Sequence, residues 1–187
     1  IGVRLVGSEM CIRDRYIKII ADIESFEEYN PLYYRTLFQC IYEGIYNDDL
    51  SVIKNLRSSD VKDNVVTLHE DDGYTYKIKV SNNLAENLKT LATIDIWKRP
   101  NRYGICRVDM RGLYGDSVFK IEHRATAVDD SYRFTYYAKL RKIAQEYIGY
   151  PLLPLQLYTS GIMHRINYLL DKNNIICLLY TSDAADD

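Results

Sequence analysis

The chain has 187 residues, with 24 basic and 26 acidic side chains and a hydrophobic fraction of 47%. A single domain of this length buries about 70% of the surface of its unfolded chain, so its core needs no disulfides or structural metal. The nearly balanced charge gives no electrostatic argument for binding to nucleic acid or to an anionic membrane.

The two ends of the chain resemble translated adapter DNA. Codons for the run Met10–Asp14 can be written ATG TGT ATA AGA GAC, and the complementary strand then encodes the run Cys177–Thr181 in a second frame. One DNA tag joined to both sides of a fragment gives such a pair, and the runs resemble the adapters of transposon-based sequencing libraries. We therefore assign residues 1–15 and 177–187 to the tag. We expect residues 16–176 to form one domain, in which basic and acidic side chains are equal in number.

Metal, cofactor and membrane motifs are not found in this middle part. Cys40 and Cys106 lack the C-x-x-C spacing, which favours buried thiols over a zinc site or a disulfide. No two histidines stand at ligand spacing, and there is no phosphate loop, dinucleotide fingerprint or G-x-S-x-G motif, so we expect neither a metal nor a cofactor. The longest uncharged stretch, residues 147–163, is shorter than the ~20 apolar residues of a membrane span. We expect no membrane span and take the cytoplasm as the default location, while transient membrane contact and the oligomeric state stay open.

The first third of the domain is predicted to be a strand followed by two short helices. Apolar side chains recur at every second position of Tyr16–Glu24, which indicates a strand. Ser25 and Glu28 have the spacing of a capping box, and Pro31 suits the first position of a second helix. The inner stripe of that second helix is predicted to be Leu37, Ile41, Gly44 and Ile45. Residues 47–64 fit a helix or a strand equally well.

From Val65 onward the apolar period is two, which predicts a meander of antiparallel strands. Asp71–Gly73 is a hairpin turn, because aspartate and glycine tolerate positive φ. Short connections between the later strands require antiparallel pairing. The later strands are predicted at Tyr74–Val80, Leu88–Lys98, Tyr103–Arg111, Ser117–Val128 and Tyr132–Leu140.

After Pro151 and Pro154 the apolar period becomes helical. The pattern predicts one long C-terminal helix that lies against the sheet. Its apolar stripe is Leu155, Tyr158, Ile162, Ile166 and Leu169.

This order of strand, two short helices, antiparallel strands and one long helix resembles the helix-grip fold of the START/SRPBCC superfamily, the lipid-transfer and polyketide-cyclase-like group. The resemblance covers residues 16–172 and rests on the element order and on the pattern DDSYRFTYYAKL followed by PLLP and a helix. It implies an α+β fold, in which a curved antiparallel meander wraps around the C-terminal helix. It also implies that a hydrophobic small molecule or lipid binds between the sheet and that helix.

The apolar side chains of one parity would line this space, and a few polar tips would orient the ligand. A solid core would show the same pattern, because an apolar strand face is alike in both cases. The predicted ligand-binding residues are Tyr76, Ile78, Ile94, Ile96, Val108, Met110, Phe119, Ile121, His123, Phe134, Tyr136, Tyr158 and Ile162.

Three functions follow from this arrangement. The first is a non-enzymatic carrier or sensor of an apolar molecule. The second is a cyclase or dehydratase that uses His123 as general acid or base together with Tyr76 or Tyr136. A core histidine bonded to a tyrosine hydroxyl explains His123 as well, since no carboxylate shares its parity nearby. The third is a protein-interaction domain with a solid core.

Two runs of the sequence have features of nucleic-acid or phosphate binding. The run RGLYGDSVF, Arg111–Phe119, partly matches an RNA-binding RNP motif, but its aromatic positions are displaced. We therefore expect no nucleic-acid partner. The basic turn KRPNR, Lys98–Arg102, stands beside Trp97 and has the chemistry to contact phosphate or lipid headgroups, although a solvated hairpin tip explains it equally.

Overall fold

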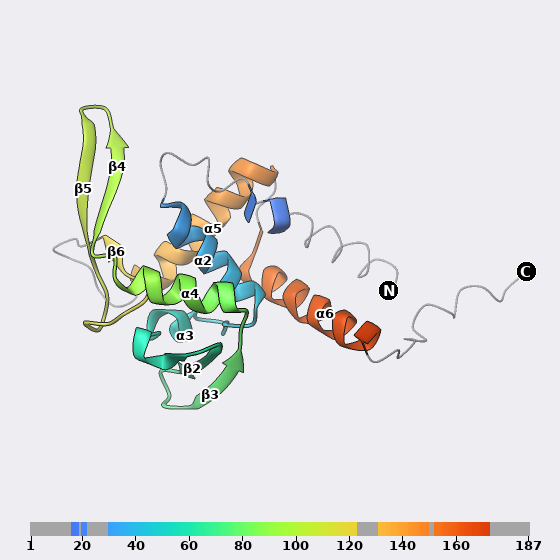
Figure 1. Ribbon diagram of the computed structural model, residues 1–187. Helices are drawn as coiled ribbons and strands as arrows, with labels where there is room; N and C mark the ends of the chain where they lie inside the picture. The colour runs from blue at the N-terminus through green and yellow to red at the C-terminus, as the bar shows by residue number, and fades with distance from the viewer. Residues whose placement is uncertain (1–15, 19, 22–29, 123–130, 150–151, 173–187) are drawn as a thin grey trace, which may run out of the picture.

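The computed structural model describes residues 16–18, 20–21, 30–122, 131–149 and 152–172. The predicted tag runs, 1–15 and 177–187, lie outside these residues, as does the predicted capping box of Ser25 and Glu28. The fold is α+β, with antiparallel sheets and a C-terminal helix (Figure 1), as predicted. Within the described ranges, no helix is both long and apolar enough to cross a membrane.

The described helices are α2 (Pro31–Tyr42), α3 (Ser51–Lys54), the 3-10 turn η2 (Ser58–Asp60), α4 (Asn82–Ala92), α5 (Ser131–Ile148) and α6 (Pro154–Lys172). The described strands are β1 (Val61–Lys62), β2 (Val65–His69), β3 (Thr75–Lys79), β4 (Ile96–Asn101), β5 (Gly104–Arg111) and β6 (Ile121–Glu122). Residues 47–64, which fit a helix or a strand equally well by sequence, contain α3, η2 and β1.

Helix α2 lies at the centre of the core and packs against α4 and α6. It begins at Pro31, as predicted, because the Asn30 side chain accepts a hydrogen bond from the Tyr33 amide at 3.1 Å and proline has no amide hydrogen to leave unpaired. Leu37 and Ile41, both predicted on its inner stripe, are fully buried.

The strands form two three-stranded antiparallel sheets, β1-β2-β3 and β4-β5-β6. The predicted hairpin turn at Asp71–Gly73 joins β2 to β3, and Gly73 has the positive φ, 87°, that this turn needs. Figure 1 shows α4 running between the two sheets and the β4–β5 hairpin extending away from the helices.

The predicted strand Leu88–Lys98 is wrong over its first half, which belongs to α4. The Ser81 hydroxyl caps this helix by accepting a hydrogen bond from the Leu84 amide at 3.2 Å. Its buried side chains recur at three- and four-residue spacing, the period of a helix: Leu84, Ala85, Leu88 and Leu91. This helix interrupts the predicted meander and divides its strands between two sheets.

The predicted strand Tyr132–Leu140 is also wrong, because these residues lie in α5. The buried positions Tyr136, Leu140, Ile143 and Ala144 follow the helical period. The prediction was wrong because the first residues of α5 alternate between apolar and polar side chains. The predicted strand at Tyr16–Glu24 is wrong where it can be compared, since residues 16–18 and 20–21 are helical. Within Ser117–Val128 the strand is limited to β6, and residues 123–128 lie outside the described part.

The C-terminal helix α6 is present as predicted, but it packs on α2 and not within a curved sheet. Leu157 and Gly161 are buried on its packed side, and a Cβ on Gly161 would collide with the Tyr42 carbonyl oxygen. Of the stripe expected to face the sheet, Leu155, Ile166 and Leu169 are exposed, while Tyr158 is half-buried and its ring stacks on Tyr46 at 4.9 Å between centroids. The described strands therefore form two sheets, and neither wraps around this helix.

Candidate functional site

The β4–β5 hairpin is the candidate functional site. Its strands pair from Ile96 opposite Asp109 to Asn101 opposite Gly104, so the turn consists of Arg102 and Tyr103. Gly104 has a φ of 121°, a conformation that side chains with a Cβ rarely adopt. Of the predicted basic turn, Lys98–Arg102, only Arg102 lies in the turn, because Lys98 and the residues up to Asn101 belong to β4.

The base of the hairpin is fixed to the core by the inner side chains of its strands. The Trp97 ring lies 6.0 Å from the Tyr33 ring and 6.1 Å from the Tyr34 ring, centroid to centroid. Val108 and Met110 on β5 are buried beside them. Beyond this anchor no described helix covers the strands in Figure 1, and the Lys98, Tyr103, Ile105 and Arg107 side chains are exposed.

Positive charge is concentrated on the hairpin although the chain as a whole carries a net charge of −2. Lys98 and Arg107 are directly opposite each other in the ladder, and both side chains are exposed. Like charges at such positions, about 5 Å apart, destabilise a sheet. Neither side chain forms an ion pair with any described residue. Residues 96–111 contain one acidic side chain, Asp109, and five basic ones, Lys98, Arg99, Arg102, Arg107 and Arg111.

Aromatic and apolar surface lies at the tip among these charges. The Arg102 guanidinium stands over the Tyr103 ring at 4.8 Å from its centroid. Tyr103 is 82% exposed and Ile105 is 77% exposed. The tip therefore offers cations, a ring for stacking and an apolar side chain in one small area.

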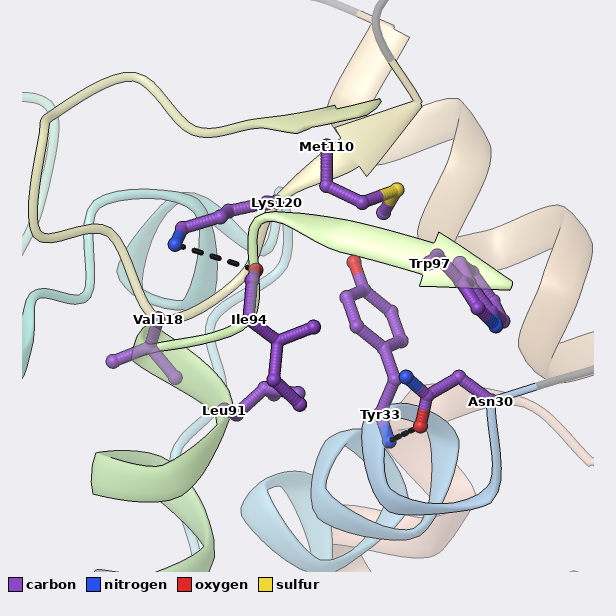
Figure 2. Close-up of a pocket in the computed structure, with 8 residues that line it drawn as sticks. All are labelled: Asn30, Tyr33, Leu91, Ile94, Trp97, Met110, Val118 and Lys120. Atoms are coloured by element: carbon purple, nitrogen blue, oxygen red, sulfur yellow. Dashed lines mark hydrogen bonds between the residues drawn. The ribbon is translucent and has the colours of Figure 1, made fainter. Parts of the chain in front are cut away.

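Below β4, buried Lys120 holds the end of α4 against the start of the hairpin. Its Nζ donates hydrogen bonds to the Ala92 carbonyl oxygen at 2.7 Å and to Asp95 Oδ1 at 2.6 Å. The Asp95 carboxylate is thereby engaged at the base of the hairpin and does not neutralise the cations above it. Figure 2 shows this amine at the side of a small, partly open cleft with an interior volume of about 10 Å³, room for about one water molecule. The cleft is lined by Asn30, Tyr33, Leu91, Ile94, Trp97, Met110, Val118 and Lys120.

The structure does not bring the predicted ligand-binding residues together at one site. Ile94 and Met110 line the cleft, and Ile96 is exposed on the outer face of β4. Four others are buried: Val108, Phe119, Ile121 and Tyr136. Tyr76 and Ile78 lie on β3, in the other sheet. Tyr158 and Ile162 lie on α6, the helix that packs on α2. His123 and the Phe134 side chain are outside the described part of the chain.

The sequence predicts the basic run Lys98–Arg102 but not the pairing of Lys98 with Arg107, because the balanced charge of the whole chain gives no sign of a locally basic pair of strands. A usable signal was present, since Lys98 and Arg107 occupy the outward parity of two strands joined by a tight turn. In the described part of the chain, no group of three or more His, Cys, Asp or Glu side chains is placed to hold a metal ion.

Comparisons with known proteins give a likeness of fold. No protein-family model and no curated protein matches the chain. Among solved structures, the chain is similar to one described as the crystal structure of XerA recombinase, with a TM-score of 0.58 and 14% sequence identity. The match covers 91% of this chain and 55% of the recombinase chain. At this identity the similarity concerns the fold alone, and the chain spans about half of the larger protein.

Proposed function

We propose that this domain binds double-stranded nucleic acid through the β4–β5 hairpin. The observation that carries the proposal is the exposed pair of cations, Lys98 opposite Arg107, on a hairpin that extends beyond the core. Two like charges held together in solvent cost stability, and an anion between them removes that cost. A nucleic-acid backbone supplies anions at regular spacing.

The shape of the hairpin supports a duplex as the partner. The major groove of DNA is about 12 Å wide and admits a two-stranded β-ribbon. In this orientation Lys98 and Arg107 would approach phosphates or base edges, while the tip residues Arg102 and Tyr103 would reach deepest. Arginine pairs well with guanine edges, and exposed rings contact bases.

The fold likeness supports the same proposal. The solved chain of similar fold is described as a recombinase, an enzyme that recombines nucleic acid. We extend to this chain the binding of nucleic acid and no reaction.

The test is a titration of a fluorescent 20-base-pair duplex with the full chain at several salt concentrations. We expect binding that weakens steeply with salt, because each phosphate contact contributes about 0.9 to the slope of log K against log salt. The double variant Lys98→Gln/Arg107→Gln should lower that slope by about two and weaken binding at least tenfold.

A matched control removes two exposed cations from helices, Lys89 on α4 and Arg141 on α5. The variant Lys89→Gln/Arg141→Gln loses the same charge but should keep the wild-type slope. The proposal is overturned if the wild-type chain shows no salt-dependent binding at micromolar concentration, or if both variants weaken it equally.

The apolar-ligand function expected from the sequence is our second proposal. Its support is the cleft of Figure 2, whose apolar lining includes Ile94 and Met110. A lipid would need this cleft to widen, because its interior holds about one water molecule. We expect the purified chain to retain an apolar molecule from cell extract, detected by mass spectrometry, and the cleft-filling variant Val118→Phe to lose it. Recovery of no molecule would remove this second proposal.

A further inference from the structure

A second basic surface lies on the β1-β2-β3 sheet, on the face turned away from the core. The inward side chains of this sheet, Val66 and Leu68, are fully buried. On the opposite parity Lys62, Lys77 and Lys79 are exposed. We call these three residues the lysine face.

The strand register places the three lysines close together. Lys62 on β1 and Lys79 on β3 both pair with Val65, so they lie in one row on either side of β2. Lys77 stands two residues from Lys79 along β3, a separation of about 6.8 Å. The row across the sheet separates Lys62 from Lys79 by about 9.6 Å, which is two strand spacings.

The strands β1, β2 and β3 contain no acidic residue, although exposed Asp63 follows Lys62 in the turn after β1. The outward neighbours on β2 are Val65 and Thr67, and none of the three lysines forms an ion pair with a described residue. Two acidic side chains beside the sheet have other partners. Asp71 in the turn binds Lys54 at 2.9 Å, and Asp60 in η2 lies 3.2 Å from the His69 ring.

A fourth cation is held at the edge of the same sheet. The Arg165 Nη2 atom of α6 donates a hydrogen bond to the Lys79 carbonyl oxygen at 2.7 Å. Strand β3 is at the edge of the sheet, and the Lys79 carbonyl group points away from β2. Arg165 therefore contacts the sheet at its free edge. The helix thus adds positive charge where the sheet already concentrates it.

We propose that the lysine face binds the phosphate backbone of the nucleic acid that the β4–β5 hairpin binds. The inference rests on the proposed function for the identity of the polyanion. Duplex DNA carries one negative charge per about 1.7 Å of helix axis, so three lysines within about 10 Å of one another can each contact a phosphate. Contacts of this kind position a protein on a duplex and carry no sequence information.

The test uses the full chain and two triple variants with the same fluorescent duplex. Lys62→Gln/Lys77→Gln/Lys79→Gln removes the charge, and Lys62→Arg/Lys77→Arg/Lys79→Arg keeps it. Three lost phosphate contacts should lower the slope of log K against log salt by about 2.7, and the arginine variant should keep the wild-type slope. The affinity of the glutamine variant should fall by a similar factor for duplexes of different sequence.

The hairpin variant Lys98→Gln/Arg107→Gln separates the two proposals. A normal slope in the glutamine triple variant together with a reduced slope in the hairpin variant overturns the lysine face and leaves the proposed function standing. Normal slopes in both overturn both. Circular dichroism and thermal unfolding check that each variant is folded; since the three lysines are exposed, their loss should not lower the melting temperature.

Discussion

The two sheets of this protein are built from similar alternating sequences and have different surroundings. In β1-β2-β3 the apolar parity is covered by the core, and Val66 and Leu68 are fully buried. In the β4–β5 hairpin the inward parity is buried only near the base, at Val108 and Met110, and Cys106 closer to the tip is only half-buried. An alternating pattern therefore identifies two faces of a ribbon, but what covers each face depends on the rest of the chain.

The difference in how the two sheets are covered affects which of their faces can bind a partner. The first sheet gives one face to stability and can use the other, with its three lysines, for contact. The hairpin gives little of its outer part to the core and can present both strands to a partner. We expect substitutions in the first sheet to change mainly the free energy of unfolding, and substitutions in the outer hairpin to change mainly binding.

The largest expected contrast is between Leu68→Ala and Ile105→Ala. Leu68 is fully buried, so its truncation should cost about 3 kcal/mol in the free energy of unfolding through lost burial and a cavity. Ile105 is 77% exposed and should change this free energy by less than about 0.5 kcal/mol. Urea unfolding followed by circular dichroism measures both. Equal losses of unfolding free energy in the two variants would show that the Ile105 side chain is buried against another part of the chain.

Local sequence signals predicted several elements correctly. Asn30 and Pro31 define the start of α2 by chemistry within four residues, and Gly73 allows the turn between β2 and β3. The C-terminal helix α6 has a similarly local cause. Each depends on a backbone preference or a helical period that neighbouring chain segments do not change.

Predictions that required a partner surface were less successful. Leu88 fits a strand and a helix, and Ser81 as N-cap decides for the helix only when the register of α4 is known. The stripe on α6 was assigned to the sheet because it is the more apolar side, but Gly161 permits close packing of the other side on α2. Of the candidate site, the basic turn was visible in the sequence, while its anchoring through Trp97 and Tyr33 depends on tertiary contacts.

A smaller effect is expected from Trp97→Ala at the boundary between core and hairpin. This half-buried ring stacks near Tyr33 and Tyr34, so its removal should cost about 2 kcal/mol in the free energy of unfolding. The hairpin should also lose its attachment, and amide hydrogen exchange in β4 and β5 should speed up more than exchange in β2 and β3. Trp97→Phe keeps a ring at this position and is the matched control. Uniform acceleration in all four strands would mean that the two sheets unfold together.

The smallest effect concerns pH and the turn of the first sheet. Hydrogen bonds from Asn55, at 2.7 Å, and Lys54, at 2.9 Å, lower the pKa of the Asp71 carboxyl below its usual value. A carboxyl with a lowered pKa in the folded state stabilises the fold above its unfolded pKa, near 4, and this contribution is lost as the pH falls through the folded pKa. Because the Asp71 side chain is 51% exposed, solvent screening limits the effect to less than about 1 kcal/mol. Urea unfolding of wild type between pH 5 and pH 2.5 or so should show this loss, and Asp71→Asn should lack it. Asn55→Ala keeps the carboxyl but removes its main donor, so its folded pKa is lowered less, and the loss should be smaller and should end at a higher pH than in wild type. An unchanged profile in both variants would assign the acid sensitivity to another part of the chain.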